Sequence, residues 1–384
     1  MMPALHEIRF RSSPHVELKQ LGELAAGQRE PFRDLENDPE FYGLFVPKPP
    51  LTMNLKSVAR QTAELFRTLA TPSHLGQPLL ADEESAGDVV DLVLDGILEI
   101  ECGDGFVSGA DALPLLCPPL EAPEVHDAAA RLSLDALLYG QDLETGDPQT
   151  LTTALYLYNR IPMSPFWKTR FSSREAILAH LGADRGALRV LLEREWIAGK
   201  STGWLSWSSK SAASRHGDAV TWKLYVSPRP ERVAEVFAVV VRVLSSAFPD
   251  THFKIGDSAY GLLRPDKLVT YFATRERLGE VAAVLHRELA GCDAHGVPFT
   301  AGLDDSGLLS WGVDPPDNDR ALRWLQRESW RMWVVKRLAA ALSIAKAARR
   351  GAAVEPWRFA LERARRQGVD IATWTPSARL WSSP

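Results

Sequence analysis

Apolar residues change their spacing several times between residues 221 and 311, and this alternation most constrains the fold. Segments with a spacing of two, typical of strands, alternate with segments spaced by three and four, which is typical of helices. The strand-like segments cover 221–226, 252–255, 267–272 and either 298–301 or 308–311, and the helical ones cover 230–244 and 275–289. The order strand, helix, strand, strand, helix, strand is that of a split β-α-β unit. It predicts an α+β sandwich in this part of the chain.

The first 210 residues are predicted to be mainly helical, with one β-hairpin. The hairpin is expected at 96–108, where two short apolar segments flank a Gly-Asp-Gly turn. Residues 1–50 show little periodicity and end in a proline-rich stretch, which predicts an extended arm. Helical spacing is found at 54–70, 126–138, 149–158, 172–182 and 185–194.

A stretch rich in serine, alanine and lysine at 206–218 predicts a domain boundary or a mobile loop. We therefore expect three parts, which are an N-terminal arm at 1–50, a mainly helical acidic domain at 51–210 and an α+β domain at 211–384. The last of these is expected to bind phosphate or peptide and to end in long helices at 318–350 and 356–367.

Charge is distributed unevenly along the chain. The 384 residues carry a net charge of −5, yet residues 81–150 contain 17 carboxylates and a single Lys or Arg, Arg131. General nucleic-acid-binding proteins are usually basic, so no nucleic-acid partner is expected. The acidic segment is either a solvated face or part of a field that steers a basic or phosphorylated peptide.

Motifs of the familiar cofactor and metal enzymes are absent from the sequence. It contains no P-loop, dinucleotide-binding, zinc-protease or serine-hydrolase motif, and no histidines at metal-ligand spacing, so neither a cofactor nor a metal is expected. No apolar run is long enough to span a membrane, and no membrane partner is expected. The three cysteines form no C-x-x-C pair, which is typical of free thiols in a reducing compartment and predicts a cytoplasmic protein.

Positively charged side chains gather on one predicted face of the sheet. Strand alternation places Lys223 and Tyr225 opposite the apolar face of the first strand. It places His252 and Lys254 opposite the apolar face of the second. If the β-α-β unit makes these two strands neighbours, the two lysines and the tyrosine share one face of the sheet.

The loop after the second strand brings Arg264 to the same region. Cations without matching carboxylates are costly to hold together unless an anion neutralises them, and phosphate is the obvious anion. The alternative is an ordinary solvent-exposed sheet face, on which lysine is common. The segment 156–160, at a helix end beside two prolines, also has two interpretations, the wall of a peptide groove or a packed helix terminus.

Three motifs carry a resemblance to a known family. They are WKLYVSP at 222–228, HFKI at 252–255 and LRPDKLVTY at 263–271, with Tyr260 between the last two. Over roughly residues 150–340 the chain resembles the HopA-like family, which includes plant-pathogen type III effectors and proteins of modified-peptide (RiPP) clusters, among them lanthipeptide and thioamide-peptide pathways. That family is distantly similar to the phosphothreonine lyases.

The resemblance implies roles for individual residues. In the lyases a lysine of the second motif removes the Cα proton of the phosphorylated residue, which implies that Lys254 is the base. Tyr225 stands where the lyases have a histidine that acts as acid toward the leaving phosphate, and a phenol with an ordinary pKa of about 10 is a weaker acid. The residues implied to bind phosphate are Lys223, Arg264 and Arg331, with Lys336, Arg275 and Arg277 as further candidates. The implied supporting residues are Asp266, Tyr260 and His252.

The function implied by the resemblance is that of a carbon–oxygen lyase. It would eliminate phosphate from phosphoserine or phosphothreonine in a precursor peptide and leave dehydroamino acids. A separate kinase-like phosphotransferase is the expected partner, because the chain contains no kinase motif. Two alternatives stay open, a non-catalytic scaffold that binds the phosphopeptide or precursor, and a type III effector that acts on host phosphoproteins.

Overall fold

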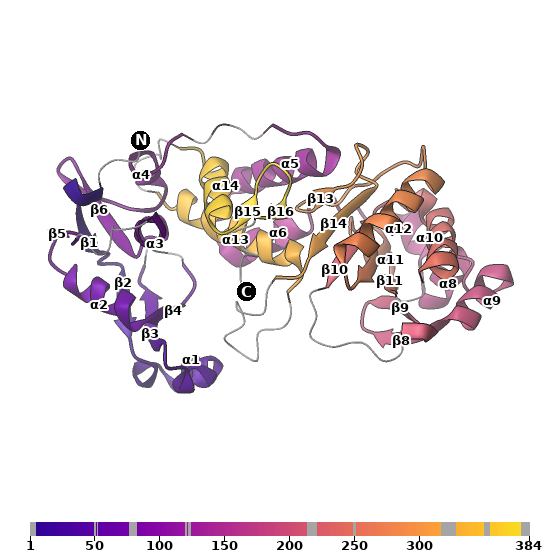
Figure 1. Ribbon diagram of the computed structural model, residues 1–384, viewed down its shortest axis with the longest axis horizontal. Helices are drawn as coiled ribbons and strands as arrows, with labels where there is room; N and C mark the ends of the chain where they lie inside the picture. Colours follow the sequence, from indigo (N-terminus) through magenta and orange to yellow (C-terminus); the bar gives the residue numbers. More distant parts are fainter. Residues whose placement is uncertain are drawn as a thin grey trace.

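The structure is a computed structural model of the chain. It describes residues 5–49, 51, 53–76, 83–119, 121, 124–212, 221–248, 251–315, 328–348 and 354–377. The molecule is elongated, with the N-terminal strands at one end, a layer of helices in the middle and a large sheet at the other end (Figure 1). It is a mixed α+β fold, as the sequence predicts. None of the described helices is long and apolar enough to cross a membrane.

The large sheet contains seven strands in the order β13-β14-β10-β12-β11-β9-β8. Its bounds are β8 (Trp196–Ser201), β9 (Trp204–Ser209), β10 (Trp222–Val226), β11 (His252–Gly256), β12 (Leu268–Phe272), β13 (Ala301–Gly302) and β14 (Leu309–Val313). Helix α10 (Val233–Ala247) connects β10 to β11, and β12 pairs antiparallel with both, between them. This is the predicted split β-α-β unit, and α12 (Arg275–Glu288) and β14 complete it.

Strand alternation decides which face of this sheet is buried under helices. Leu224 and Val226 of β10, with Phe253 and Ile255 of β11, belong to the same apolar cluster as the buried face of α10. The same cluster includes residues of α12 and of α8 (Arg174–His180) and α9 (Gly186–Glu195). The opposite face of the strands therefore faces the helical layer in the middle of the molecule. The cleft described below lies between this face and the helices.

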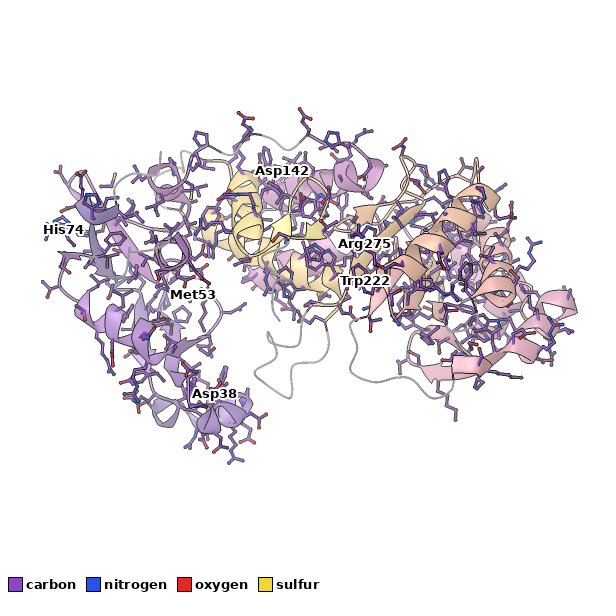
Figure 2. All side chains as sticks on the ribbon, viewed as in Figure 1. Asp38, Met53, His74, Asp142, Trp222 and Arg275 are labelled. Atoms are coloured by element: carbon purple, nitrogen blue, oxygen red, sulfur yellow. The ribbon has the colours of Figure 1, made fainter. Side chains whose placement is uncertain are left out.

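The expected arm at residues 1–50 is wrong, because this segment forms strands. They belong to two sheets, β5-β1-β6-β7 and β2-β3-β4, at the far end of the molecule from Trp222 (Figure 2). The bounds are β1 (Arg9–Ser12), β2 (Val16–Lys19), β3 (Phe41–Pro47), β4 (Lys56–Ala59), β5 (Ser73–His74), β6 (Leu98–Cys102) and β7 (Gly105–Val107). Strands of four residues are too short to show a period, and Phe10 pairs with Ile100, far along the chain. The hairpin predicted at 96–108 is confirmed as β6 and β7.

The apolar cores divide the chain differently from the predicted boundary near residue 210. One core joins the N-terminal strands to the central helices, and the other extends from Trp167 to Val313. Strands β8 and β9 precede the expected boundary, yet they pair with β11 in the large sheet. The longer helices that meet in the first core include α3 (Glu83–Leu94), α5 (Ala128–Asp142), α6 (Pro148–Tyr156), α13 (Trp330–Lys346) and α14 (Pro356–Arg366).

Shorter elements connect these parts. The helices are α1 (Ala26–Arg29), α2 (Arg60–Thr68), α4 (Leu113–Leu116), α7 (Pro165–Arg170) and α11 (Ala259–Leu262), and a small hairpin is formed by β15 (Val369–Asp370) and β16 (Thr375–Pro376). Several helices begin at a side chain that caps the first turn, among them α5 at Asp127 and α13 at Ser329. The predicted helix at 318–350 is observed from residue 330, and its first part lies outside the described residues.

Candidate functional site

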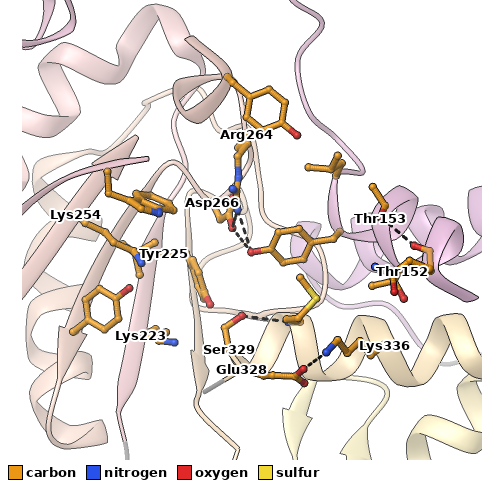
Figure 3. Close-up of a pocket in the computed structure, with 18 residues that line it drawn as sticks. Thr152, Thr153, Lys223, Tyr225, Lys254, Arg264, Asp266, Glu328, Ser329 and Lys336 are labelled. Carbon is orange, nitrogen blue, oxygen red and sulfur yellow. Dashed lines mark hydrogen bonds and ion pairs between the residues drawn. The ribbon is translucent and has the colours of Figure 1, made fainter. Parts of the chain in front are cut away.

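A cleft of about 910 Å³ separates the open face of the large sheet from the central helices. One wall is formed by β9, β10, β11 and β12 with the α11 segment, and the other by α6 and the beginning of α13 (Figure 3). Seven of the candidate residues singled out from the sequence line it, namely Lys223, Tyr225, Lys254, Tyr260, Arg264, Asp266 and Lys336. The structure thus brings most of the predicted site together in one cavity.

The two lysines do not come from neighbouring strands, because β12 lies between β10 and β11. The expectation of adjacency is wrong, since the split unit inserts an antiparallel strand into the β-α-β connection. Two residues of the inserted strand β12 also line the cleft. Tyr271 is paired with Lys223 of β10, and Val269 is paired with Lys254 of β11. The Nζ atoms of Lys223 and Lys254 lie 5.6 and 5.4 Å from the centre of the Tyr271 ring, so both amines are near the same aromatic side chain.

Lys254 is the cleft cation that stands apart from carboxylates. Its Nζ lies 4.3 Å from the centre of the Trp204 ring, and within the described part of the chain it has no hydrogen bond or ion pair. Burial and the charge of Lys223 lower the pKa of Lys254 to about 8, with a further contribution from Arg264. A substantial share of this amine is therefore neutral near physiological pH, and a neutral amine can accept a proton.

Lys223 is 9% exposed and forms an ion pair with Asp314, which directly follows β14. The two strands β10 and β14 are adjacent in the sheet, and this pairing places the carboxylate beside the amine. Asp314 could not be recognised as a partner from the sequence, because the two residues are 91 positions apart. A phosphate that contacts Lys223 therefore shares it with a carboxylate.

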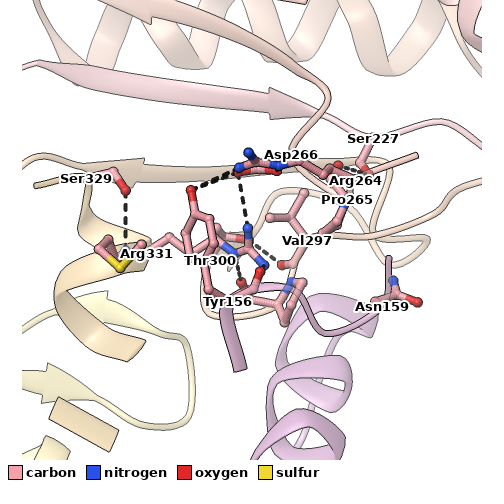
Figure 4. A network of polar contacts seen from close by, with 12 residues as sticks. Tyr156, Asn159, Ser227, Arg264, Pro265, Asp266, Val297, Thr300, Ser329 and Arg331 are labelled. Atoms are coloured by element: carbon pink, nitrogen blue, oxygen red, sulfur yellow. Dashed lines mark hydrogen bonds and ion pairs between the residues drawn. The ribbon is translucent and has the colours of Figure 1, made fainter. Parts of the chain in front are cut away.

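Arg264 is held by a fork-shaped ion pair with Asp266. Its Nε and Nη2 donate to the two carboxylate oxygens at 2.8 and 2.7 Å, and Nη2 also donates to the Tyr156 hydroxyl at 3.1 Å. The Tyr156 hydroxyl donates to Asp266 at 3.2 Å (Figure 4). Burial alone would raise the pKa of Asp266, but the guanidinium groups of Arg331 and Arg264 hold it well below its usual range. The carboxylate stays ionised and fixes the position of Arg264.

Arg331 lies behind the cleft, where it does not contact the cavity. It is 1% exposed, and its Nη1 atom lies 3.1 Å from the Asp266 carboxylate. Its Nε donates to the Pro298 carbonyl at 3.0 Å and its Nη2 to the Tyr156 carbonyl at 2.6 Å. The implied role as a direct phosphate ligand does not agree with this position. Arg331 instead orders Asp266 and the end of α6.

Tyr225 lines the cleft but is otherwise buried. Burial, with the neighbouring Tyr156 and Asp314, raises the pKa of Tyr225 well above its ordinary value. The phenol stays protonated and can donate a hydrogen bond to an anion in the cleft, but it gives up its proton less readily than the histidine it would replace.

The four remaining candidate residues differ in their position relative to the cleft. His252 shares the strand face of Lys254, but its Nδ1 atom contacts the Ser208 hydroxyl at 2.9 Å and it does not line the cavity. Lys336 does line the cavity, and it pairs with Glu328 at the start of α13. Arg275 and Arg277 are on α12 and stack on Trp311 and Phe248, away from the cleft.

Two glycines set the distance between β11 and α11. A Cβ atom on Gly256 would lie 2.5 Å from the carbonyl carbon of Gly261, so any side chain at this position would push the two segments apart. Gly256 ends the strand of Lys254, and Gly261 lies beside Tyr260 on α11. This close approach keeps the Arg264 loop over the strand that carries the proposed base.

Three further aromatic residues complete the cleft, and two of them, Tyr271 and Trp204, were not expected there from the sequence. Tyr271 follows from the alternation of β12, since it is two residues from Val269 on the same face. Trp204 comes from β9, whose position next to β11 depends on long-range pairing that no local pattern shows. Tyr156 belongs to the segment for which a groove wall and a packed helix end were both considered. It lines the cleft and is hydrogen-bonded at the end of α6.

Metal chemistry has no support from the described residues. Among them, no three side chains of histidine, cysteine, aspartate or glutamate come together in a way that would hold a metal ion.

Comparison with known proteins gives structural neighbours only. No family model matches the sequence, and no curated protein matches it. An effector protein from Pseudomonas syringae pv. tomato strain DC3000 has a TM-score of 0.36 and 13% identity, over 65% of this chain and 98% of that chain. An effector protein from Pseudomonas syringae pv. syringae strain 61 has the same TM-score and coverage, with 12% identity. These TM-scores are too low for the likeness to bear on the chemistry of the cleft.

Proposed function

We propose that the cleft binds a phosphorylated serine or threonine of a peptide and eliminates its phosphate. The observation that carries this proposal is the position of Lys254, a half-buried amine without a carboxylate partner among the described residues, beside two other cations. A base is most effective when its pKa lies near the working pH, and a pKa of about 8 satisfies that condition. The resemblance to the HopA-like family assigns the same lysine to the same step.

The elimination needs one base and a stabilised leaving group. Neutral Lys254 takes the Cα proton of the phosphorylated residue, and the electron pair of that C–H bond forms the Cα=Cβ double bond. The Cβ–O bond breaks, and the phosphate leaves with its electron pair. The products are a dehydroamino acid and inorganic phosphate, and the base is regenerated when Lys254 releases its proton to solvent. No external oxidant or reductant is required.

The leaving phosphate would be stabilised by Lys223, Arg264 and the Tyr225 hydroxyl, which all line the cleft. The first two hold their charges in fixed positions because Asp314 and Asp266 bind them. Such preorganised donors can stabilise developing negative charge without rearrangement during the reaction. Tyr225 contributes a hydrogen bond, while the cations carry the charge compensation.

The finer assignment concerns the source of the peptide. We propose a precursor peptide of a modified-peptide pathway, of the lanthipeptide or thioamide type, phosphorylated by a separate kinase-like partner. The support is the resemblance of the strand motifs, together with the absence of kinase motifs from the sequence. The same chemistry on a host phosphoprotein is the alternative for a type III effector.

Elimination has a direct mass signature. A phosphopeptide incubated with the purified protein is expected to lose about 98 Da, the mass of phosphoric acid, without loss of the polypeptide chain. A thiol added afterwards should couple to the new double bond, which distinguishes elimination from hydrolysis, where the mass loss is about 80 Da. Intact phosphopeptide after prolonged incubation would contradict the lyase proposal.

A specific observation favours a non-catalytic scaffold as the second candidate. Three of the four cations that line the cleft, Lys223, Arg264 and Lys336, are already paired with carboxylates. A paired cation binds phosphate less strongly than a free one, which suits recognition more than strong charge stabilisation. Phosphopeptide binding without turnover would support this candidate.

The pH dependence of elimination should follow the titration of Lys254. Because only the neutral amine acts as base, kcat/KM is expected to rise about tenfold per pH unit below pH ~7 and to level off above pH ~8.5. Replacing Lys223 with methionine removes a neighbouring positive charge that lowers the pKa of Lys254, so the midpoint should move to higher pH. A stopped assay of phosphate release across this range measures both profiles. A flat profile would exclude Lys254 as the titrating base.

A further inference from the structure

A second cavity of about 600 Å³ continues from the cleft across α6. Gln149, Thr153 and Leu157 line both cavities, so the two share one wall. The second cavity then extends along residues 158–160 to Tyr139 on α5. We call this second cavity the flank groove.

A stacked pair marks the junction on the side of the sheet. The guanidinium of Arg160, which lines the flank groove, lies 4.6 Å from the centre of the Tyr260 ring, which lines the cleft. Tyr260 is exposed, and Arg160 is partly exposed. A chain that leaves the cleft here therefore passes over a planar surface before it reaches the flank groove.

The chemistry of the flank groove suits an uncharged side chain. The rings of Tyr139 and Tyr158 lie 5.3 Å apart at 42°, and Tyr139 is 43% exposed. Leu157 and Ala154 add apolar surface, and Arg160 is the charged residue among those that line it. Exposed tyrosines provide apolar area together with hydroxyl groups that can contact a peptide backbone.

The end of α6 is held rigidly by a buried set of hydrogen bonds. Asn159 has a φ of 64°, in the left-handed region that asparagine tolerates, and its Nδ2 donates to the His295 carbonyl at 2.8 Å. His295 Nε2 contacts the Asn159 carbonyl at 2.5 Å, and Lys267 Nζ contacts His295 Nδ1 at 2.7 Å. The turn that carries Tyr158 and Arg160 is therefore fixed before any ligand arrives.

We infer that the flank groove binds an apolar or aromatic side chain that lies on one side of the phosphorylated residue in the same peptide. This inference rests on the proposed function, because it takes the phosphorylated residue to occupy the cleft. The shared residues of α6 make the two cavities one continuous path, and an extended peptide advances about 3.3 Å per residue along it. The occupant is a segment of the substrate, and recognition of that segment selects which phosphorylated residues react.

Phosphonate peptides test the inference without turnover. Their phosphorus is joined through carbon, so the bond that elimination would break is absent, and calorimetry can measure binding to the full-length protein. Three peptides are compared, a core of about four residues around the phosphonate and two versions extended by about six residues with a phenylalanine, toward the N-terminus or the C-terminus. One extension is expected to bind about tenfold more tightly than the core, and the other about as tightly as the core.

In the wild type, the dissociation constant of the core peptide is expected to be about ten times that of the preferred extended peptide. In the variant Tyr139→Ala this ratio should fall toward one. Tyr139 is exposed, so the fold should survive, and thermal unfolding checks this. Val190→Ala, at another exposed apolar residue on α9, should leave the ratio unchanged. Equal binding of all three peptides, or a ratio that Tyr139→Ala does not change, would overturn the flank groove.

The two proposals fail in different ways in this experiment. If the core peptide binds and neither extension adds affinity, the phosphate cleft stands and the flank groove is wrong. If the extended peptides bind equally well with and without the phosphonate group, the groove binds peptide and the phosphate site is wrong.

Discussion

Replacing Lys254 with methionine is expected to lower the rate of phosphate elimination by roughly 10²- to 10⁴-fold, the usual contribution of a general base. Methionine retains most of the apolar stem of lysine, so the main change is the loss of the amine that lies near the rings of Trp204 and Tyr271. With phosphopeptide in excess of enzyme, substrate binding and product release would contribute to the measured rate. The experiment is therefore a single-turnover one, with enzyme in excess and the product followed by mass.

The matched control is Lys254→Arg. Arginine keeps the positive charge over the aromatic rings, but its guanidinium stays protonated in proteins and cannot serve as base. This variant should bind the phosphonate peptide within about threefold of the wild type, yet eliminate phosphate as slowly as Lys254→Met. Undiminished elimination in both variants would show that another group removes the Cα proton. Tight binding with no elimination even in the wild type would favour the scaffold.

Asp266→Asn is expected to lower the free energy of unfolding by about 3–5 kcal/mol, because it removes a buried negative charge and leaves its partners without compensation. Asp266 is 4% exposed, and its carboxylate contacts both Arg264 and Arg331. Asparagine has nearly the same shape, so the change in packing is small. Urea denaturation, followed by tryptophan fluorescence, measures the effect.

Two further variants isolate the cause. Asp257→Asn breaks a more exposed pair with Arg174 and should cost less than about 1 kcal/mol. Adding Arg331→Met to Asp266→Asn removes one of the uncompensated guanidinium groups and should restore part of the lost stability. A loss below about 1 kcal/mol in Asp266→Asn alone would show that the network contributes little to stability.

The free energy of unfolding at acid pH should also depend on Asp266. Its pKa in the folded protein is lower than its ordinary value of about 3.9 in an unfolded chain. Its contribution is therefore fully present above that value and is lost as the pH falls toward the folded-state pKa. In Asp266→Asn this part of the pH dependence should be absent, and stability should vary less between about pH 5 and pH 2.

Local patterns predicted the faces of the sheet but not its order. The alternation in β10 correctly separated Lys223 and Tyr225 from Leu224 and Val226, because side chains of a strand point to opposite sides whatever its neighbours are. The place of β12 between the two lysine strands depends on pairing across distant segments. For the same reason, Asp314, which is 91 positions from Lys223, could not be assigned as its partner from spacing.

The N-terminal strands were also not predicted, because their pairing depends on segments that are distant in the sequence. Phe10 and Phe45 are buried in the first core, yet each lies in a short segment whose partners come from elsewhere in the chain. A period cannot be read from the four residues of β1, and the proline-rich end of residues 1–50, which β3 enters, indicated an arm. The hairpin at 96–108 was predictable because its two strands and its turn are contiguous in sequence.

Hydrogen bonds around Tyr156 connect the two walls of the cleft. Tyr156 belongs to the helical wall, and its hydroxyl and carbonyl are bound by residues of both walls, Arg264 and Asp266 on one side and Arg331 on the other. These contacts tie the two walls of the cleft together at Tyr156. Separating the walls there would break the buried ion pair between Arg331 and Asp266 and the hydrogen bonds of the Tyr156 hydroxyl. A bulky folded domain would have to break these contacts to enter between the walls, so under the proposed function we expect the phosphorylated residue to reach the cleft on a slender, unfolded stretch of chain.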